Sequence, residues 1–173
     1  MKETLQDIKT RRSCRKYTTE QITEEELSTV LEAGTYAASG HGSQSAKMVV
    51  VQEPKMLAEL SRLNAIIMNA KHDPFYGAPT AVLVFMDTTS PTGMQDATLV
   101  MGNLMLAAHA VGLGSCWINR CKPMMELPEG LAIRESWGLD PKYAGLGICI
   151  LGYAAEGGIV PAKPRKADYV QRV

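Results

Sequence analysis

Four short apolar segments, separated by segments with helical periodicity, constrain the fold of this chain more than any other feature. They have the length and the bounding turn residues of buried strands, and they span residues 48–51, 81–86, 115–118 and 146–153. Strands that alternate with helices are typical of a layered α/β domain. No repeat or linker interrupts the chain, so we expect residues 1–173 to form a single domain.

The segments between these strands predict helices. They cover about residues 24–37, about 54–69, a long stretch that follows Gly93 and ends at Val111, and residues 129–137. The first helix has the clearest start, because Thr23 and Glu26 have the spacing of a capping box.

Residues 97–119 contain no acidic residue, lysine or arginine, and their number approaches the ~20 residues that cross a bilayer. We do not expect a membrane span, because Asn103 and His109 would be costly in lipid and Gly112–Gly114 stops the helix. A helix buried nearly all round, in the core or in a subunit interface, fits better. The first eight residues lack the apolar run of a secretory signal, so we expect a cytoplasmic protein.

The charge balance and the cysteine spacing argue against a nucleic-acid-binding protein and against a metal site. The chain has 18 basic and 18 acidic residues and only two phenylalanines, which argues against a nucleic-acid surface. Its four cysteines show no paired spacing, so we expect no metal site. Cys116 and Cys149 lie in apolar segments and are expected to be reduced core residues.

Three arginines crowd the short stretch Arg11-Arg12-Ser13-Cys14-Arg15. A guanidinium group matches phosphate oxygens bidentately, and the serine hydroxyl can bond a further oxygen. The stretch is therefore either a phosphate clamp or a solvated basic loop, and on its own it favours neither.

The carboxy-terminal segment, residues 154–173, has no periodicity of its own. A long structureless segment usually binds something or is disordered. Because the segment carries Tyr169 and Val170 as well as a basic cluster, we expect it to pack across a partner subunit.

In order and spacing, several motifs together resemble the FMN-dependent nitroreductase family, a set of homodimeric flavin enzymes. They lie along nearly the whole chain: Arg11-Arg12-Ser13-Cys14-Arg15-Lys16-Tyr17, Tyr36-Ala37-Ala38-Ser39-Gly40 before Ser43-Gln44, Pro74-Phe75-Tyr76-Gly77-Ala78-Pro79, the run from Ala108 to Ile118, and Gly152-Tyr153 followed by Lys163-Pro164-Arg165-Lys166. The resemblance implies an α/β (α+β) domain with a mixed, mostly antiparallel sheet of four or five strands in an intertwined homodimer.

The resemblance also implies the FMN site. Residues near the phosphate, the ribityl chain and the ring would be Arg11, Arg12, Ser13, Arg15, Asn64, Gly114 and Ser115, and Lys163 and Arg165 of the carboxy-terminal segment would close the phosphate end. The partner subunit would contribute a loop that contains Ala38, Ser39, Gly40, Gly42 and Gln44. For Asn64, a solvated helix residue is the alternative. Glycine at 114 is expected because a backbone close to a flat ring leaves no room for a Cβ.

The implied activity is an oxidoreductase that uses NAD(P)H to reduce nitroaromatic, quinone-like or related acceptors by a ping-pong hydride transfer. No catalytic side chain is expected, because the cofactor carries the chemistry. The alternative is an FMN-storing or FMN-sensing protein of the same fold, because the loop departs from the family pattern at Ala38, Gly42 and Ser45-Ala46. Two extra glycines, Gly40 and Gly42, are expected to loosen this loop.

Overall fold

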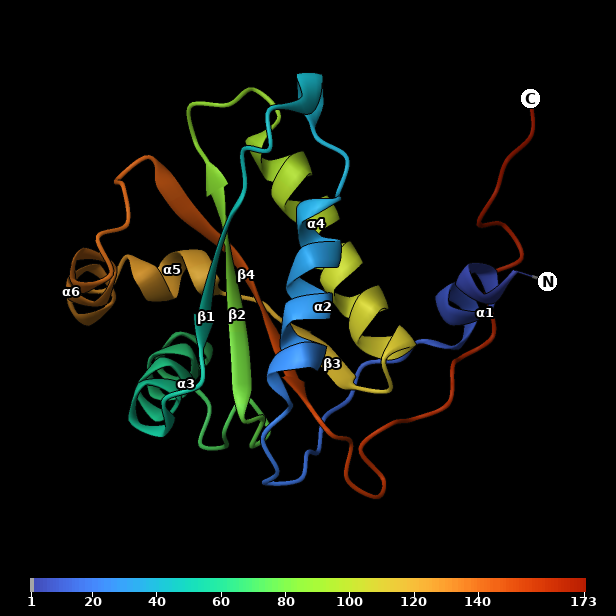
Figure 1. The fold of residues 1–173 in the computed structure, drawn as a ribbon, viewed down its shortest axis with the longest axis horizontal. Helices are drawn as coiled ribbons and strands as arrows, with labels where there is room; N and C mark the ends of the chain where they lie inside the picture. Colours follow the sequence, from blue (N-terminus) through green and yellow to red (C-terminus); the bar gives the residue numbers. More distant parts are fainter. Residues whose placement is uncertain (1) are drawn as a thin grey trace.

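The computed structural model describes residues 2–173, which form a central antiparallel sheet with helices on both faces (Figure 1). The strands are β1 (Lys47–Val51), β2 (Thr80–Asp87), β3 (Gly114–Ile118) and β4 (Tyr143–Gly152), in the order β1-β2-β4-β3. Each neighbouring pair is antiparallel. The four apolar segments of the sequence are these four strands, and the expected α+β architecture is confirmed.

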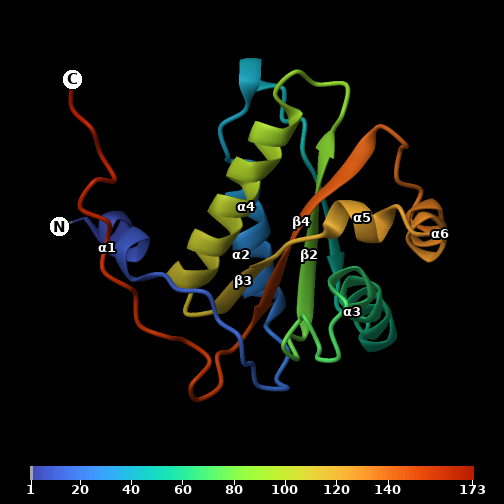
Figure 2. The ribbon, with the colours of Figure 1, turned by 180° about the vertical axis from the view of Figure 1, so that it is seen from behind.

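The helices lie in two layers. One face of the sheet is covered by α2 (Glu24–Thr35) and α4 (Gly93–Ala110), and the other by α3 (Pro54–Met68), α5 (Cys121–Met125) and α6 (Pro128–Ser136) (Figures 1 and 2). The amino-terminal helix α1 (Glu3–Thr10) packs against α4 outside these layers. The short helix α5 was not predicted.

Strand β2 shows why its sequence is a continuous apolar run. Leu83 and Phe85 face the core under α3 and α5, whereas Val82 and Val84 face the core under α2 and α4, and all four are fully buried. A strand covered on both faces has no solvent side for polar residues. Cys116 and Cys149 are buried and free, as expected.

The capping box at the start of α2 is confirmed. The Glu26 amide donates to Thr23 Oγ1 at 3.2 Å, and the Thr23 amide donates to Glu26 Oε2 at 2.8 Å. The same carboxylate accepts a hydrogen bond of 2.7 Å from the Tyr153 hydroxyl just after β4. This shared carboxylate therefore fixes α2 to the end of the sheet.

In a single chain, helix α4 is buried on one face only. Its inner face is buried, but within one chain its outer face is exposed at Met94, Leu99 and Gly102. In a single chain, the outer face of α4 thus leaves the apolar side chains of Met94 and Leu99 exposed. Within residues 2–173, no helix meets the length and apolarity needed to cross a membrane.

Candidate functional site

The arginine segment lies along the outer edge of β3. Ser13 pairs with Ser115 in a parallel bridge, and the Cys14 amide donates to the Ser115 carbonyl at 2.9 Å. On its other side, Cys14 pairs with Ile159 and the Arg15 amide donates to the Gly158 carbonyl at 2.8 Å. Residues 11–15 are therefore held between the sheet and the start of the carboxy-terminal segment.

Two glycines make room for this arrangement. A Cβ on Gly114 would lie 2.9 Å from both Cβ and Sγ of Cys14, and a Cβ on Gly158 would lie 2.4 Å from the Lys16 carbonyl oxygen. The reason for glycine at 114 that the structure shows is thus the fully buried Cys14. The expected approach of a flat ring to Gly114 stays a prediction.

The three guanidinium groups have different environments. Nη1 of Arg11 is buried and has no hydrogen-bond partner in the structure. Nη1 of Arg12 donates to the carbonyls of Lys9 at 2.8 Å and Arg11 at 2.5 Å, so it closes the end of α1. Arg15 is exposed. Among residues 2–173, none of these arginines takes part in an ion pair, so the cluster offers positive charge to an external anion.

The carboxy-terminal segment divides into two parts. Ala154 pairs with Tyr17 and Ile159 pairs with Cys14, so this first part packs on the arginine segment of its own chain. Beyond Val160 the segment is exposed and runs on the side of the molecule that carries α1 (Figure 1). Lys163 and Arg165 lie in this exposed part.

Asn64 is not a solvated helix residue. It is fully buried on α3, where Nδ2 donates to the Asn119 carbonyl at 2.9 Å and Oδ1 accepts from Arg120 Nε at 3.2 Å. Asn64 thus holds the turn that follows β3, in which Arg120 has a left-handed backbone with φ of 72°. Arg120 was not selected from the sequence. The only sequence feature that points to Arg120 is a positive charge two residues after the end of an apolar strand.

The loop of residues 38–44 lies at the opposite end of α4 from the arginine segment. The Gly40 amide donates to Asp96 in the first turn of α4, whereas Thr10 Oγ1 is 2.8 Å from Nε2 of His109 in the last turn. Since a helix rises about 1.5 Å per residue, these two contacts are roughly 20 Å apart. A single chain therefore does not bring the two predicted halves of the site together.

Gly40 lies close to the start of α4. Its Cβ would lie 2.4 Å from Thr92 Oγ1, so glycine is needed for the loop to approach the start of α4. Gly42 has open space around it and a φ of 65°, a conformation that glycine adopts at little cost.

The sequence and the structure also match known proteins. The profile of the Nitroreductase family matches residues 8–153, and the chain belongs to this family. A nitroreductase with bound FMN from Bacteroides fragilis is 31% identical, with a TM-score of 0.91 over 100% of both chains. An FMN-dependent nitroreductase from Clostridium difficile is 28% identical, with a TM-score of 0.85 over 99% of both chains. An NADPH-flavin oxidoreductase of Vibrio harveyi is 27% identical over 77% of this chain and 63% of that protein.

Proposed function

We propose that this protein is an FMN-dependent oxidoreductase that uses NAD(P)H to reduce nitroaromatic, quinone-like or related acceptors. The observation that carries the proposal is the arginine segment on β3, in which a buried guanidinium nitrogen of Arg11 has no partner. A buried donor without an acceptor is costly, and an anionic or carbonyl-bearing ligand at this edge would supply one. Relatives of the same fold are described with bound FMN.

The residues present fit FMN in charge and in hydrogen-bonding groups. Arg11, Ser13 and Arg15 would hold it from the edge of β3, with Lys163 and Arg165 of the exposed segment closing the phosphate end. Each charge-assisted hydrogen bond to the phosphate would contribute about 1.5–3 kcal/mol. Arg12 can add its remaining nitrogens, because only Nη1 bonds the end of α1.

FMN, when bound, would supply the hydride-transfer chemistry between NAD(P)H and the acceptor. The chain itself orients the ligands and stabilises charge. Positive charge from Arg11 near the ring edge would favour the negative charge that develops on reduction. NAD(P)H and the acceptor would use the same space in turn, which gives ping-pong kinetics.

The site is completed by a second copy of the chain, which supplies residues Ala38, Ser39, Gly40, Gly42 and Gln44. Two observations support this homodimer. The loop and the arginine segment of one chain lie at opposite ends of α4, and the outer face of α4 leaves Met94 and Leu99 exposed. Burying such a face against a second copy gives both the stability of the dimer and a shared site.

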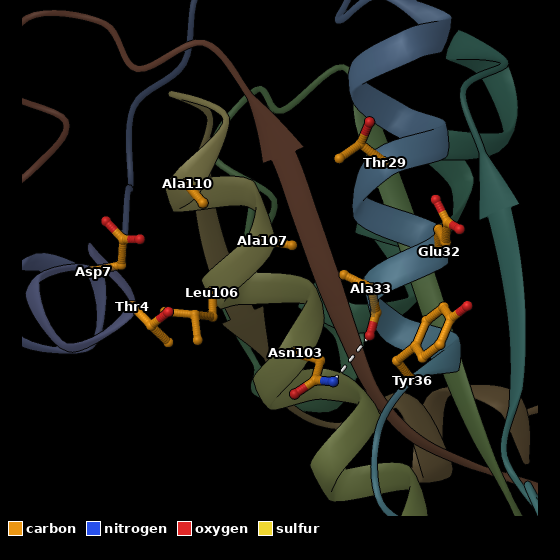
Figure 3. Close-up of a pocket in the computed structure, with 10 residues that line it drawn as sticks. All are labelled: Thr4, Asp7, Thr29, Glu32, Ala33, Tyr36, Asn103, Leu106, Ala107 and Ala110. Atoms are coloured by element: carbon orange, nitrogen blue, oxygen red, sulfur yellow. Dashed lines mark hydrogen bonds between the residues drawn. The ribbon is translucent and has the colours of Figure 1, made fainter. Parts of the chain in front are cut away.

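A groove next to this face supports the same arrangement. It has a volume of about 500 Å³ and lies between α1, α2 and α4 (Figure 3). Asp7 and Glu32 line it together with small and apolar residues, and neither lysine nor arginine does. It is therefore unsuited to a phosphate. The exposed end of the second copy's chain, with Lys166, Tyr169 and Arg172, complements it in charge and polarity.

The visible spectrum of the purified protein tests the cofactor, and reaction with reduced nicotinamide tests the activity. We expect flavin absorption bands, and rapid bleaching on mixing with NADH or NADPH under argon. A yellow protein that neither nucleotide bleaches would support the storage or sensing alternative. A protein that stays colourless after incubation with FMN would contradict both.

A further inference from the structure

We propose that Asp96 is a positioning residue for the flavin site of the partner subunit, because it fixes the loop that this chain contributes to that site. The inference rests on the proposed function. It assigns a role to a buried carboxylate that does not itself touch the cofactor and that the sequence analysis did not select.

Asp96 accepts hydrogen bonds from both ends of the loop. Its Oδ1 accepts from the Gly40 amide at 2.9 Å. Its Oδ2 accepts from the hydroxyls of Ser45 at 2.6 Å, Thr92 at 3.1 Å and Ser43 at 3.2 Å. Both ends of the loop and the start of α4 are thus joined through one carboxylate, whose residue is only 3% exposed.

The loop needs such an anchor because its backbone is strained. His41 and Gln44 have φ values of 54° and 48°, in the left-handed region that residues with a Cβ rarely adopt. Each such residue costs roughly 1–2 kcal/mol. Hydrogen bonds from outside the loop must offset this cost for a single conformation to persist.

Apart from the close approach of Gly40 to Thr92, side-chain packing contributes little to holding the loop. The side chains of His41, Ser43 and Gln44 are exposed, and of residues 38–45 only Ser45 is buried. A cavity of about 120 Å³ lies between the loop and helices α2 and α4, with Asp96 in its wall. The hydrogen bonds to Asp96 are therefore what determines the position of the loop.

The electrostatics agree with this role. The Ser45 hydroxyl and the Gly40 amide, together with Thr92 and Ser43, lower the pKa of Asp96, so its carboxylate is ionised near neutral pH. A negative charge in the first turn of α4 is also favoured by the helix dipole.

The test compares Asp96→Ala and Asp96→Asn in the full-length dimer by two readouts. The first is the Kd for FMN from quenching of its fluorescence, and the second is hydrogen exchange of residues 39–45 without FMN. Asp87→Asn is the matched control, because Asp87 is similarly buried and hydrogen-bonded but holds Thr89 and Lys142 instead of the loop.

We expect Asp96→Ala to raise the Kd about tenfold or more and to speed exchange in the loop. The Kd of Asp96→Asn should stay within about threefold of the wild-type value. Its amide oxygen still accepts from the Gly40 amide, and the hydroxyl groups can accept hydrogen bonds from its amide nitrogen instead of donating them. Asp87→Asn should leave the Kd unchanged. Should Asp96→Ala fail to fold, Ser45→Ala removes only the shortest bond and should raise the Kd about threefold.

Wild-type FMN affinity in Asp96→Ala, or in Ser45→Ala if the former does not fold, would overturn the role of Asp96. It would leave the proposed function intact. Absence of FMN binding by the wild-type protein would instead overturn the proposed function. Faster loop exchange in Asp96→Ala would still show that the carboxylate holds the loop.

Discussion

Ser13 and Ser115 form a parallel bridge that places Cys14 over Gly114. This contact sets the distance between the arginine segment and β3. It also explains why a cysteine stands between the arginines, because this small side chain is fully buried against the edge of the sheet.

The first prediction concerns Gly114→Ala. The new methyl group would meet Cys14 at 2.9 Å, so we expect a loss of about 1–3 kcal/mol in the free energy of unfolding, measured with urea. The double variant Gly114→Ala with Cys14→Ala removes the sulfur contact and should lose less than the sum of the two single variants. Strict additivity would show that the two residues do not interact.

The second prediction concerns Arg11→Ala, which removes a buried donor that has no partner. We expect the Kd for FMN to rise about tenfold to a hundredfold, since a charge-assisted hydrogen bond contributes about 1.5–3 kcal/mol. The stability of the FMN-free protein should not fall, because no hydrogen bond is lost. The control is Lys122→Ala, which removes an exposed cation on α5 that pairs with Glu126. This variant should leave the Kd for FMN unchanged.

The third prediction concerns the outer face of α4. Leu99 is 48% exposed in the single chain, and Leu99→Glu places a charge in the proposed interface. We expect monomers in sedimentation velocity and loss of FMN, because each site needs both chains. Leu131→Glu on α6 is matched in exposure, at 50%, and should remain dimeric and yellow. A Leu99→Glu protein that stays dimeric would contradict the proposed interface.

The fourth prediction concerns the pH dependence of stability through Asp87. Hydrogen bonds from Lys142 and from Thr89 lower the pKa of Asp87 to about 2. Its value in the unfolded chain is about 3.9, so the folded state binds the proton less tightly. The contribution of Asp87 is therefore complete above about pH 4 and is lost as the pH falls towards 2.

Urea unfolding of wild type and Asp87→Asn at several pH values measures this contribution. We expect the variant to be less stable at pH 7, with the difference between the two proteins shrinking below pH 4. A difference that stays constant down to pH 2.5 would show that the ionised Asp87 carboxylate contributes nothing.

Local features of the sequence were sufficient to predict the strands and the longer helices. The capping box of Thr23 and Glu26 is formed as expected because its partners are three residues apart. The run that forms β2 was recognisable because both faces of that strand are covered. Helix α5 was missed because five residues after a left-handed Arg120 carry too little periodicity.

Features that depend on distant contacts could not be read from the sequence. Asp96, the proposed anchor, bonds Ser45 and Gly40, which lie 51 and 56 positions before it in the sequence. A Cβ at position 40 would collide with Thr92, and a Cβ at position 114 would collide with Cys14. The predicted division of the site between two chains came from the family resemblance alone, because no local pattern shows that α4 separates the arginine segment from the loop.

Complementation between two defective chains tests the composite FMN site most directly. Arg11→Ala disables the arginine segment, and Gly40→Val disables the loop through its collision with Thr92. Co-expressed with different affinity tags, the two variants form a heterodimer with one intact and one doubly altered site. We predict one FMN for each heterodimer and little FMN in either parent homodimer. A heterodimer that retains no more FMN than its parents would contradict a site shared between subunits.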